Sequence, residues 1–186
     1  VRSEFIKGSF FDQKLLKKIL DDVDTVIHLA ALKDAGESMV LPKKYLVHNI
    51  IETLNLINTC VKKKIEKFIF SSSAAVYGIP NYLPLDERHP LNPINYYGYS
   101  KLCIENNLNW INNLTGMKVS CLRYFNAAGY DIKNRIREVE KNPSNLLPII
   151  LNVVLNKKKE LSVYGDDYDT KDGTCIRDYI HVSDLA

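Results

Sequence analysis

Two side chains able to move a proton, Tyr97 and Lys101, lie four residues apart in the segment "NYYGYSKLCIE". The segment has the pattern of a helix start, and side chains four apart on a helix are neighbours on one face. A free tyrosine has a pKa of about 10, so a tyrosine base working near pH 7 needs about 4 kcal/mol of phenolate stabilisation. An ammonium group within about 6 Å supplies roughly one to three pKa units of this. The pair indicates a tyrosine base assisted by a lysine, with a plain surface contact as the simpler alternative.

A third candidate, Ser73, ends the serine run of "KFIFSSSAAVYG". This segment is typical of a buried strand that breaks into a polar loop. A hydroxyl at the mouth of a strand can hydrogen-bond to the same substrate oxygen that the tyrosine deprotonates, although serines after strands are also common helix caps. Ser73, Tyr97 and Lys101 together predict a Ser–Tyr–Lys set for proton transfer.

The elements that must position these side chains alternate along the chain. The sequence predicts a short strand within 4–12, further strands at 23–31, 118–129 and 160–165, and a strand that breaks into a serine-rich loop within 67–78. It predicts helices at 13–22 and at about 42–64, 97–113 and 146–155. Alternation of helices with continuous apolar strands indicates an α/β fold, a doubly wound parallel sheet of the Rossmann type. Ligands of such sheets bind beyond the carboxyl ends of the strands. The segments "HLAALK", "SSSAAVYG" and "RYFNAAG" lie at those ends and are expected to form the site.

The composition excludes several classes of protein. The chain of 186 residues has a net charge of +3, too small to indicate nucleic-acid binding, and 46% hydrophobic residues, ordinary for a soluble domain. No apolar run approaches the roughly 18 residues of a membrane span. The four cysteines are scattered without the spacing of a zinc site, so no metal is expected, and reduced thiols indicate a cytoplasmic protein. Both ends cut through predicted elements, so we expect the interior of a longer protein, truncated at both ends.

Four motifs in this order, "SSSAAVYG", "YYGYSK", "LRYFNAAG" and "DGTCIRDYIHVSDLA", resemble the extended short-chain dehydrogenase/reductase family over essentially the whole chain. Within that family the resemblance is to the enzymes that epimerise UDP-hexoses at carbon 4. It implies a tightly bound NAD and a UDP-sugar substrate oxidised transiently at carbon 4. It also implies that 1–140 is a partial NAD-binding domain lacking its first βα units and that 141–186 begins the UDP-sugar-binding region.

The resemblance assigns roles to individual residues. Tyr97 would be the base that takes the proton of the sugar's 4-hydroxyl, Lys101 would hold the nicotinamide ribose and lower the pKa of the tyrosine, and Ser73 would hydrogen-bond to the 4-oxygen. The cofactor-binding set would be Lys33, Ala30, Ala31, Asn49, Ser71, Tyr97, Lys101 and Tyr124. The substrate-binding set would be Ser73, Phe125, Asn126, Asn145, Leu146, Tyr164 and Arg177, of which the arginine suits a diphosphate because its fork pairs two oxygens.

Several of these residues have simpler interpretations. Aromatic residues are more often buried in the core than in contact with a ligand, so the simpler interpretation of Phe125 and Tyr164 is that they are core residues. The simpler interpretation of Arg177 is an ion pair with the adjacent Asp178. His28, inside an apolar strand, is interpreted as a buried histidine with a hydrogen-bond partner.

The sequence also departs from the family pattern. The glycine-rich phosphate loop of dinucleotide folds is absent. Ser9 stands where relatives usually have an aspartate facing the adenine, and Ala75 where many carry a second hydroxyl. These departures leave the adenine contacts and one substrate contact open.

Other functions remain as alternatives. A nucleotide-sugar dehydratase needs an acidic pair just after the serine, where this chain has Ala74 and Ala75, so dehydration is disfavoured. Another nucleotide-sugar epimerase or reductase of the same family, or a non-catalytic NAD-binding fragment, stays open, as does acceptance of N-acetylated sugars. The 186 residues alone are expected to bind NAD poorly and to be inactive. The full protein is expected to be a homodimer through the helices at 43–64 and 97–113.

Overall fold

The structure is a computed structural model that describes residues 3–133, 135 and 143–186. The chain divides into two compact units, Val1–Tyr124 and Phe125–Ala186. The predicted domain boundary after residue 140 falls outside the described residues and stays a prediction.

The first unit alternates helices and strands. Its elements are α1 (Gln13–Ile19), β1 (Thr25–His28), α2 (Ala35–Val40), α3 (Pro42–Tyr45), the π-helix η1 (Leu46–Ile51), α4 (Glu52–Lys62), β2 (Lys67–Ser73), the 3₁₀-helix η2 (Ala74–Val76), α5 (Tyr96–Thr115) and β3 (Lys118–Tyr124). The helix predicted at 42–64 is therefore three consecutive helical segments, with proline at the first position, where its missing N–H costs nothing. Helix α5 ends at Gly116, which adopts the left-handed conformation with φ of 76°.

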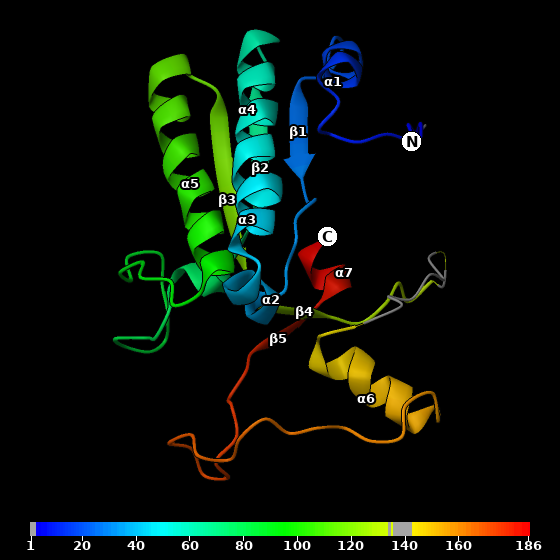
Figure 1. Cartoon of the computed structure of the whole chain (residues 1–186). Helices are drawn as coiled ribbons and strands as arrows, with labels where there is room; N and C mark the ends of the chain where they lie inside the picture. The colour runs from blue at the N-terminus through cyan, green and yellow to red at the C-terminus, as the bar shows by residue number, and fades with distance from the viewer. Residues whose placement is uncertain (1–2, 134, 136–142) are drawn as a thin grey trace. The chain divides into compact units, whose positions relative to one another are not determined.

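The three strands form one parallel sheet in the order β1-β2-β3. Parallel neighbours in sequence need crossovers, and the segments α2–α4 and α5 supply them. In Figure 1, α4 and α5 lie side by side across one face of this sheet. This confirms the predicted parallel α/β architecture of the Rossmann type.

The core of the first unit lies between the sheet and these two helices. Phe68 and Phe70 of β2 pack against Ile57 of α4 and against Ile104 and Leu108 of α5, and all five are almost fully buried. The alternation of β2, with every second side chain buried, places Phe68 and Phe70 on the helix side. A helix anchored on this core has a defined position relative to the end of β2, where the candidate residues lie.

The second unit contains two short parallel strands, β4 (Asn126–Ala128) and β5 (Tyr179–His181), with α6 (Leu146–Val154) and α7 (Val182–Leu185). The strand predicted at 118–129 is divided between β3 and β4.

Two other predicted strands, within 4–12 and at 160–165, are wrong: the structure has no strand there. A strand needs a neighbour to satisfy its backbone groups. Among the described residues, neither segment has a strand beside it to supply those hydrogen bonds.

Two further properties bear on the environment of the protein. Within the described part of the chain, no helix combines the length and apolar character that a membrane span requires. Cys60, Cys103, Cys121 and Cys175 are all free thiols.

Candidate active site

The carboxyl ends of β2 and β3 place Ser73 directly beside Tyr124 in the strand register. Ser73 then begins η2, and its hydroxyl accepts a hydrogen bond from the backbone N–H of Ala75 at 3.2 Å. The same hydroxyl lies close enough to the phenol of Tyr97 to lower its pKa. The structure therefore brings together, at the edge expected for ligands, the serine and the tyrosine that are 24 positions apart (97 − 73) in the chain.

In the first turn of helix α5, backbone N–H groups donate hydrogen bonds to side-chain oxygens. Asn95 caps the helix by accepting from Gly98 N at 2.8 Å, and Ser38 Oγ accepts from Tyr97 N at 3.0 Å. Gly98 lets the helix approach η2 closely, because a Cβ there would lie 2.4 Å from the carbonyl oxygen of Ala75. These three contacts fix the first turn of α5 against the end of β2, which sets the position of Tyr97.

Lys101 lies one turn further along α5 and is 4% exposed. Its Nζ donates to the carbonyl oxygen of Ser71 at 2.6 Å and lies 4.8 Å from the ring centroid of Phe70 and 5.8 Å from that of Tyr97. Burial lowers the pKa of this amine from 10.5 to about 8. The lysine is therefore held against the strand, with its ammonium group close to the tyrosine as the helical spacing predicted.

The pKa of Tyr97 is raised above its ordinary value of 10. Burial of the phenol is the larger cause, and the hydrogen bond with Ser73 opposes it. The chain's own groups thus leave this tyrosine a weak acid. The acidification expected for a base stays a prediction that calls on a further positive charge beside the ring.

Asn49 connects the loop after β1 to helix α5. Its side-chain oxygen accepts from Leu32 N and its amide donates to Leu32 O, both at 2.9 Å, and the amide also reaches Ser100 Oγ at 3.2 Å. Ser100 Oγ in turn donates to the carbonyl oxygen of Tyr97 at 2.7 Å. Asn49 lies in η1, and single π-helical turns often occur at functional sites. The bridge joins Asn49 to the first turn of α5, while its predicted place behind the catalytic residues stays a prediction.

The loop held by Asn49 carries Ala30, Ala31 and Lys33, all exposed beyond the end of β1. Small side chains at such a strand end allow a ligand to approach the backbone. Asp34, next along the same loop, caps α2 by accepting from Glu37 N at 2.8 Å. Its carboxylate therefore has a local structural task.

His28 is a buried histidine with a partner, as predicted. Its Nε2 lies 3.2 Å from Thr53 Oγ1. Burial, with the Lys101 charge as a second cause, lowers the pKa of His28 from 6.5 to about 4. The imidazole is neutral at pH 7 and stacks with the ring of Phe70, over which the ammonium group of Lys101 lies.

The predicted substrate residues that follow Tyr124 belong to the second unit. Asn126 on β4 donates from Nδ2 to the carbonyl oxygen of Asp178 at 2.8 Å, which brings it close to the segment of Arg177. The Arg177 guanidinium lies beside Cys175 and helps lower the pKa of that thiol, after the larger effect of Tyr168. Among residues 143–186, Arg177 forms no ion pair with Asp178, so the simpler interpretation fails.

The other members of this set lie on separate exposed segments. Asn145 and Leu146 form the start of α6, whereas Tyr164 lies in the loop before β5 and is 91% exposed. Phe125, at the start of the unit, is 40% exposed. Neither aromatic is a core residue, contrary to the base-rate interpretation. No described hydrogen bond joins Asn145 or Tyr164 to Asn126.

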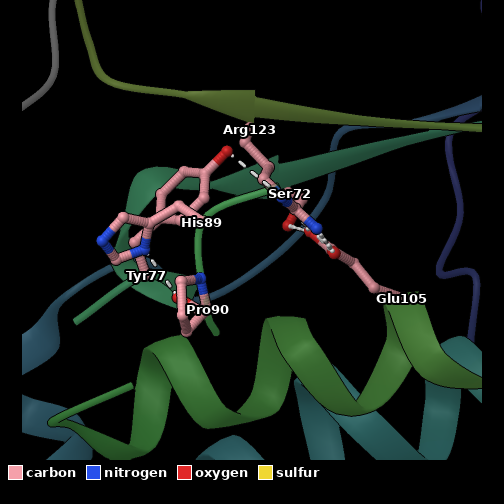
Figure 2. Close-up of polar contacts among 6 residues, drawn as sticks. All are labelled: Ser72, Tyr77, His89, Pro90, Glu105 and Arg123. Atoms are coloured by element: carbon pink, nitrogen blue, oxygen red, sulfur yellow. Dashed lines mark hydrogen bonds and ion pairs between the residues drawn. The ribbon is translucent and has the colours of Figure 1, made fainter. Parts of the chain in front are cut away.

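Three positioning residues escaped the sequence analysis. Ser38 accepts from the backbone of Tyr97 across 59 residues, and the buried Glu105 forms an ion pair with the partly exposed Arg123 beside Ser72 (Figure 2). Only Glu105 carried a signal, because it lies four residues after Lys101 on the same helix face.

Comparison with known proteins gives one consistent result. Residues 1–186 match the profile of the "NAD dependent epimerase/dehydratase family". The chain is 45% identical over 184 residues to a UDP-glucose 4-epimerase from Halalkalibacterium halodurans, covering 98% of this chain and 55% of that protein.

Two solved structures are also similar. A UDP-glucose 4-epimerase from Brucella ovis in complex with NAD superposes with a TM-score of 0.92 at 41% identity, over 98% of this chain and 57% of the other. One from Bifidobacterium longum in complex with NAD+ and UDP gives a TM-score of 0.92 at 42% identity, over 97% and 55%. The chain thus spans about half the length of the relatives it matches.

Proposed function

Since this chain belongs to the NAD dependent epimerase/dehydratase family, we propose that the protein carrying it interconverts UDP-glucose and UDP-galactose at carbon 4 with tightly bound NAD. The observation that carries the proposal is the contact of Ser73 with Tyr97 at the strand ends, with buried Lys101 one helical turn away. The names of the relatives and their NAD and UDP complexes support the same reaction.

The residues at the strand ends suit a nicotinamide dinucleotide. Lys101 uses one of its three N–H donors on Ser71 O, and among the described residues no other hydrogen bond engages it, so two donors remain for ribose hydroxyls. The exposed loop with Ala30, Ala31 and Lys33 would take the dinucleotide backbone, and Tyr124 would lie beside the nicotinamide. Bound NAD would accept a hydride from carbon 4 and return it to the opposite face.

Tyr97 and Ser73 would handle the proton of the sugar hydroxyl. Tyr97 would remove the proton from the 4-hydroxyl, and Ser73 would donate a hydrogen bond to the same oxygen. The positive nicotinamide ring and Lys101 would favour the phenolate, against the burial that raises the pKa of Tyr97. The intermediate 4-keto sugar would rotate in the site so that its opposite face receives the hydride, and Tyr97 would then return the proton to the 4-oxygen.

The UDP part of the substrate would be bound by the second unit. Arg177 would pair with the diphosphate, and Asn145, Leu146 and Tyr164 would contact the nucleotide. Phe125 and Asn126 would contact the region between sugar and phosphate. The exposure of Phe125, Tyr164 and Arg177 supports roles as ligand contacts rather than as core residues.

The dehydratase alternative lacks a residue for its extra step. Dehydration needs an acid that protonates a leaving hydroxyl, and the two residues after Ser73 are Ala74 and Ala75 in η2. Epimerisation needs only the proton and hydride exchanges already described.

The protein is further proposed to be a cytoplasmic homodimer of galactose metabolism. Helix α5 supports the dimer, because Tyr99, Trp110 and Leu114 on it are exposed, Trp110 by 67%. The four free thiols agree with a reducing compartment. Light scattering of the natural protein and of Trp110→Glu tests the dimer: the variant should have half the mass of the wild type.

The reaction is tested directly by incubating the protein at its full natural length with UDP-galactose and no added NAD. UDP-glucose should accumulate, because the coenzyme stays bound and is regenerated in each turnover. Parallel incubation with UDP-N-acetylgalactosamine reports whether N-acetylated sugars are accepted. Absence of both products from protein shown to contain NAD would contradict the proposed reaction.

A further inference from the structure

Behind the candidate site lies a second polar cluster, made by Ser72 of β2, Glu105 of α5 and Arg123 of β3 (Figure 2). Glu105 is 2% exposed, and the structure surrounds its carboxylate with donors. Arg123 Nε lies 3.1 and 3.2 Å from its two oxygens, and Nη2 lies 2.7 Å from Oε2. Ser72 Oγ donates to Oε1.

The cluster continues from Arg123 to Tyr77. Arg123 Nη1 donates to the hydroxyl of Tyr77 at 3.1 Å, and its guanidinium carbon lies 5.0 Å from the centroid of that ring. Tyr77 packs edge-on against His89, whose Nδ1 donates to the carbonyl oxygen of Pro90 at 2.7 Å and whose Nε2 accepts from Asn81 N at 2.8 Å. Glu105 is thereby tied to the segment that follows Ser73.

The position of Glu105 relates it to the reacting groups. Tyr97, Lys101 and Glu105 follow each other at intervals of four on α5 and so share one face. They face three consecutive residues of β2. Lys101 donates to the carbonyl of Ser71 and Glu105 accepts from the hydroxyl of Ser72, while the phenol of Tyr97 lies near the hydroxyl of Ser73. Any sliding of α5 along β2 that changes the contact of Glu105 must also change the other two.

An ion pair that buries one carboxylate and most of its arginine partner adds little stability by itself. Removing two charges from water costs about as much as their attraction returns, and apolar replacements are often neutral or stabilising. The bidentate pairing of Arg123 with Glu105 instead fixes the position of the two side chains relative to each other, because such pairs are directional. Because Arg123 also lies on β3 next to Tyr124, the pair fixes α5 against two strands at once.

We propose that Glu105 is a positioning residue for the reaction, which, through Ser72 and Arg123, sets the register of α5 on β2 and thereby the placement of Tyr97 and Lys101. This inference rests on the proposed epimerase function. Misplacing a reacting group by about 1 Å can cost about 100-fold in rate. The chemistry should therefore depend on Glu105 although its buried carboxylate is engaged by Ser72 and Arg123.

The test uses three variants of the full-length protein. Glu105→Gln keeps the shape of the side chain but removes its charge. Arg123→Lys keeps the charge but cannot pair with both carboxylate oxygens as the guanidinium does. Ser72→Ala removes one hydroxyl. We expect kcat to fall by about tenfold or more in the first two and by about threefold in the third, with KM changed by less than about twofold. Asp21→Asn, which breaks the exposed ion pair with Lys63, is the control and should leave both parameters unchanged.

A second readout does not need turnover. The absorbance of the phenolate is measured as the pH is raised. The signal of Tyr97 is the difference in absorbance between each protein and the same protein that also carries Tyr97→Phe. Its midpoint should move in Glu105→Gln and Ser72→Ala and stay in place in Asp21→Asn. If the wild type shows no epimerisation, the proposed function fails, while this titration still tests the positioning.

Two results would overturn the positioning role of Glu105. Variants that melt at lower temperature but keep the wild-type kcat and Tyr97 titration would make the cluster purely structural and overturn the proposal. Should Glu105→Gln not fold, Ser72→Ala decides by the same criteria, because it leaves the ion pair intact. A loss expressed wholly in KM would equally overturn it, since positioning of a base acts on the chemical step.

Discussion

The amine of Lys101 donates a 2.6 Å hydrogen bond to the backbone carbonyl oxygen of Ser71, near the end of the strand whose last residue, Ser73, lies close to the phenol of Tyr97. The lysine is buried at this point, and burial lowers its pKa to about 8. The protein therefore holds a charge in an unfavourable environment, close to the ring that we propose as the base.

Replacing Lys101 by methionine should abolish activity and stabilise the fold at pH 7. The buried amine is charged at pH 7, and its pKa is about 8 rather than 10.5, so its burial costs about 3 kcal/mol. The variant also loses the hydrogen bond to Ser71, which reduces its gain in stability by about 1 kcal/mol. We expect Lys101→Met to unfold at a higher denaturant concentration than the wild type at pH 7.

The advantage of Lys101→Met should shrink as the pH rises from 8 to 10.5. In that window the unfolded wild type binds a proton that the folded wild type has released, so the wild type gains stability while the variant does not. Urea titrations at several pH values measure this. Lys67→Met, at an exposed lysine at the start of β2, is the control and should show no such convergence.

His28 should make the protein sensitive to acid. Its pKa is about 4 in the fold against 6.5 when unfolded, so the stabilisation is complete above pH 6.5 and is lost as the pH falls toward 4, by about 3 kcal/mol in total. His28→Gln keeps a hydrogen-bonding group for Thr53 but does not titrate. The variant should lose less stability than the wild type between pH 6.5 and 4, as measured by urea unfolding. Equal losses would show that other groups cause the acid sensitivity.

Tyr97 should be needed for turnover in a way that its neighbour Tyr99 is not. Removal of a general base typically costs about 100- to 10,000-fold in rate. Tyr97→Phe deletes only the hydroxyl, and we expect a loss in this range with the protein still folded by circular dichroism. Tyr99→Phe, two residues along the same helix and exposed, should retain the rate. A Tyr97→Phe enzyme of wild-type rate would mean that another group accepts the proton.

Ser38 should matter through the backbone of Tyr97. Ser38→Ala leaves the N–H of Tyr97 buried without its acceptor, which should destabilise the fold by about 1 kcal/mol. Freedom of the first turn of α5 should also lower kcat by about tenfold with little change in KM. Ser120→Ala, at an exposed position of β3, is the matched control. Unchanged kcat in a destabilised Ser38→Ala protein would limit Ser38 to a capping role.

Local patterns predicted the parts of the site that lie within single elements. The four-residue spacing of Tyr97 and Lys101 predicted one helix face, and both side chains do lie on one face of α5. The apolar runs before "HLAALK" and "SSSAAVYG" predicted parallel strands that end at the site, which β1 and β2 confirm. These features follow from side-chain periodicity, which is a property of neighbouring residues alone.

Failures occurred where structure depends on residues far apart. The segments within 4–12 and at 160–165 have the composition of strands, but strand formation requires a partner that composition does not reveal. The exposure of Phe125 and Tyr164 contradicted base rates, because packing and not residue type decides what is buried.

By itself the sequence determined the alternation of strands and helices, the shared face of Tyr97 and Lys101, and the family to which the chain belongs. Only the tertiary structure decided that Ser38 accepts from Tyr97, that Asn49 bridges Leu32 and Ser100, and that Glu105 pairs with Arg123. It also decided that burial raises the pKa of Tyr97 and lowers that of Lys101. The physical reason is that hydrogen-bond partners and desolvation depend on which distant segments pack together, whereas periodicity is written into each segment separately.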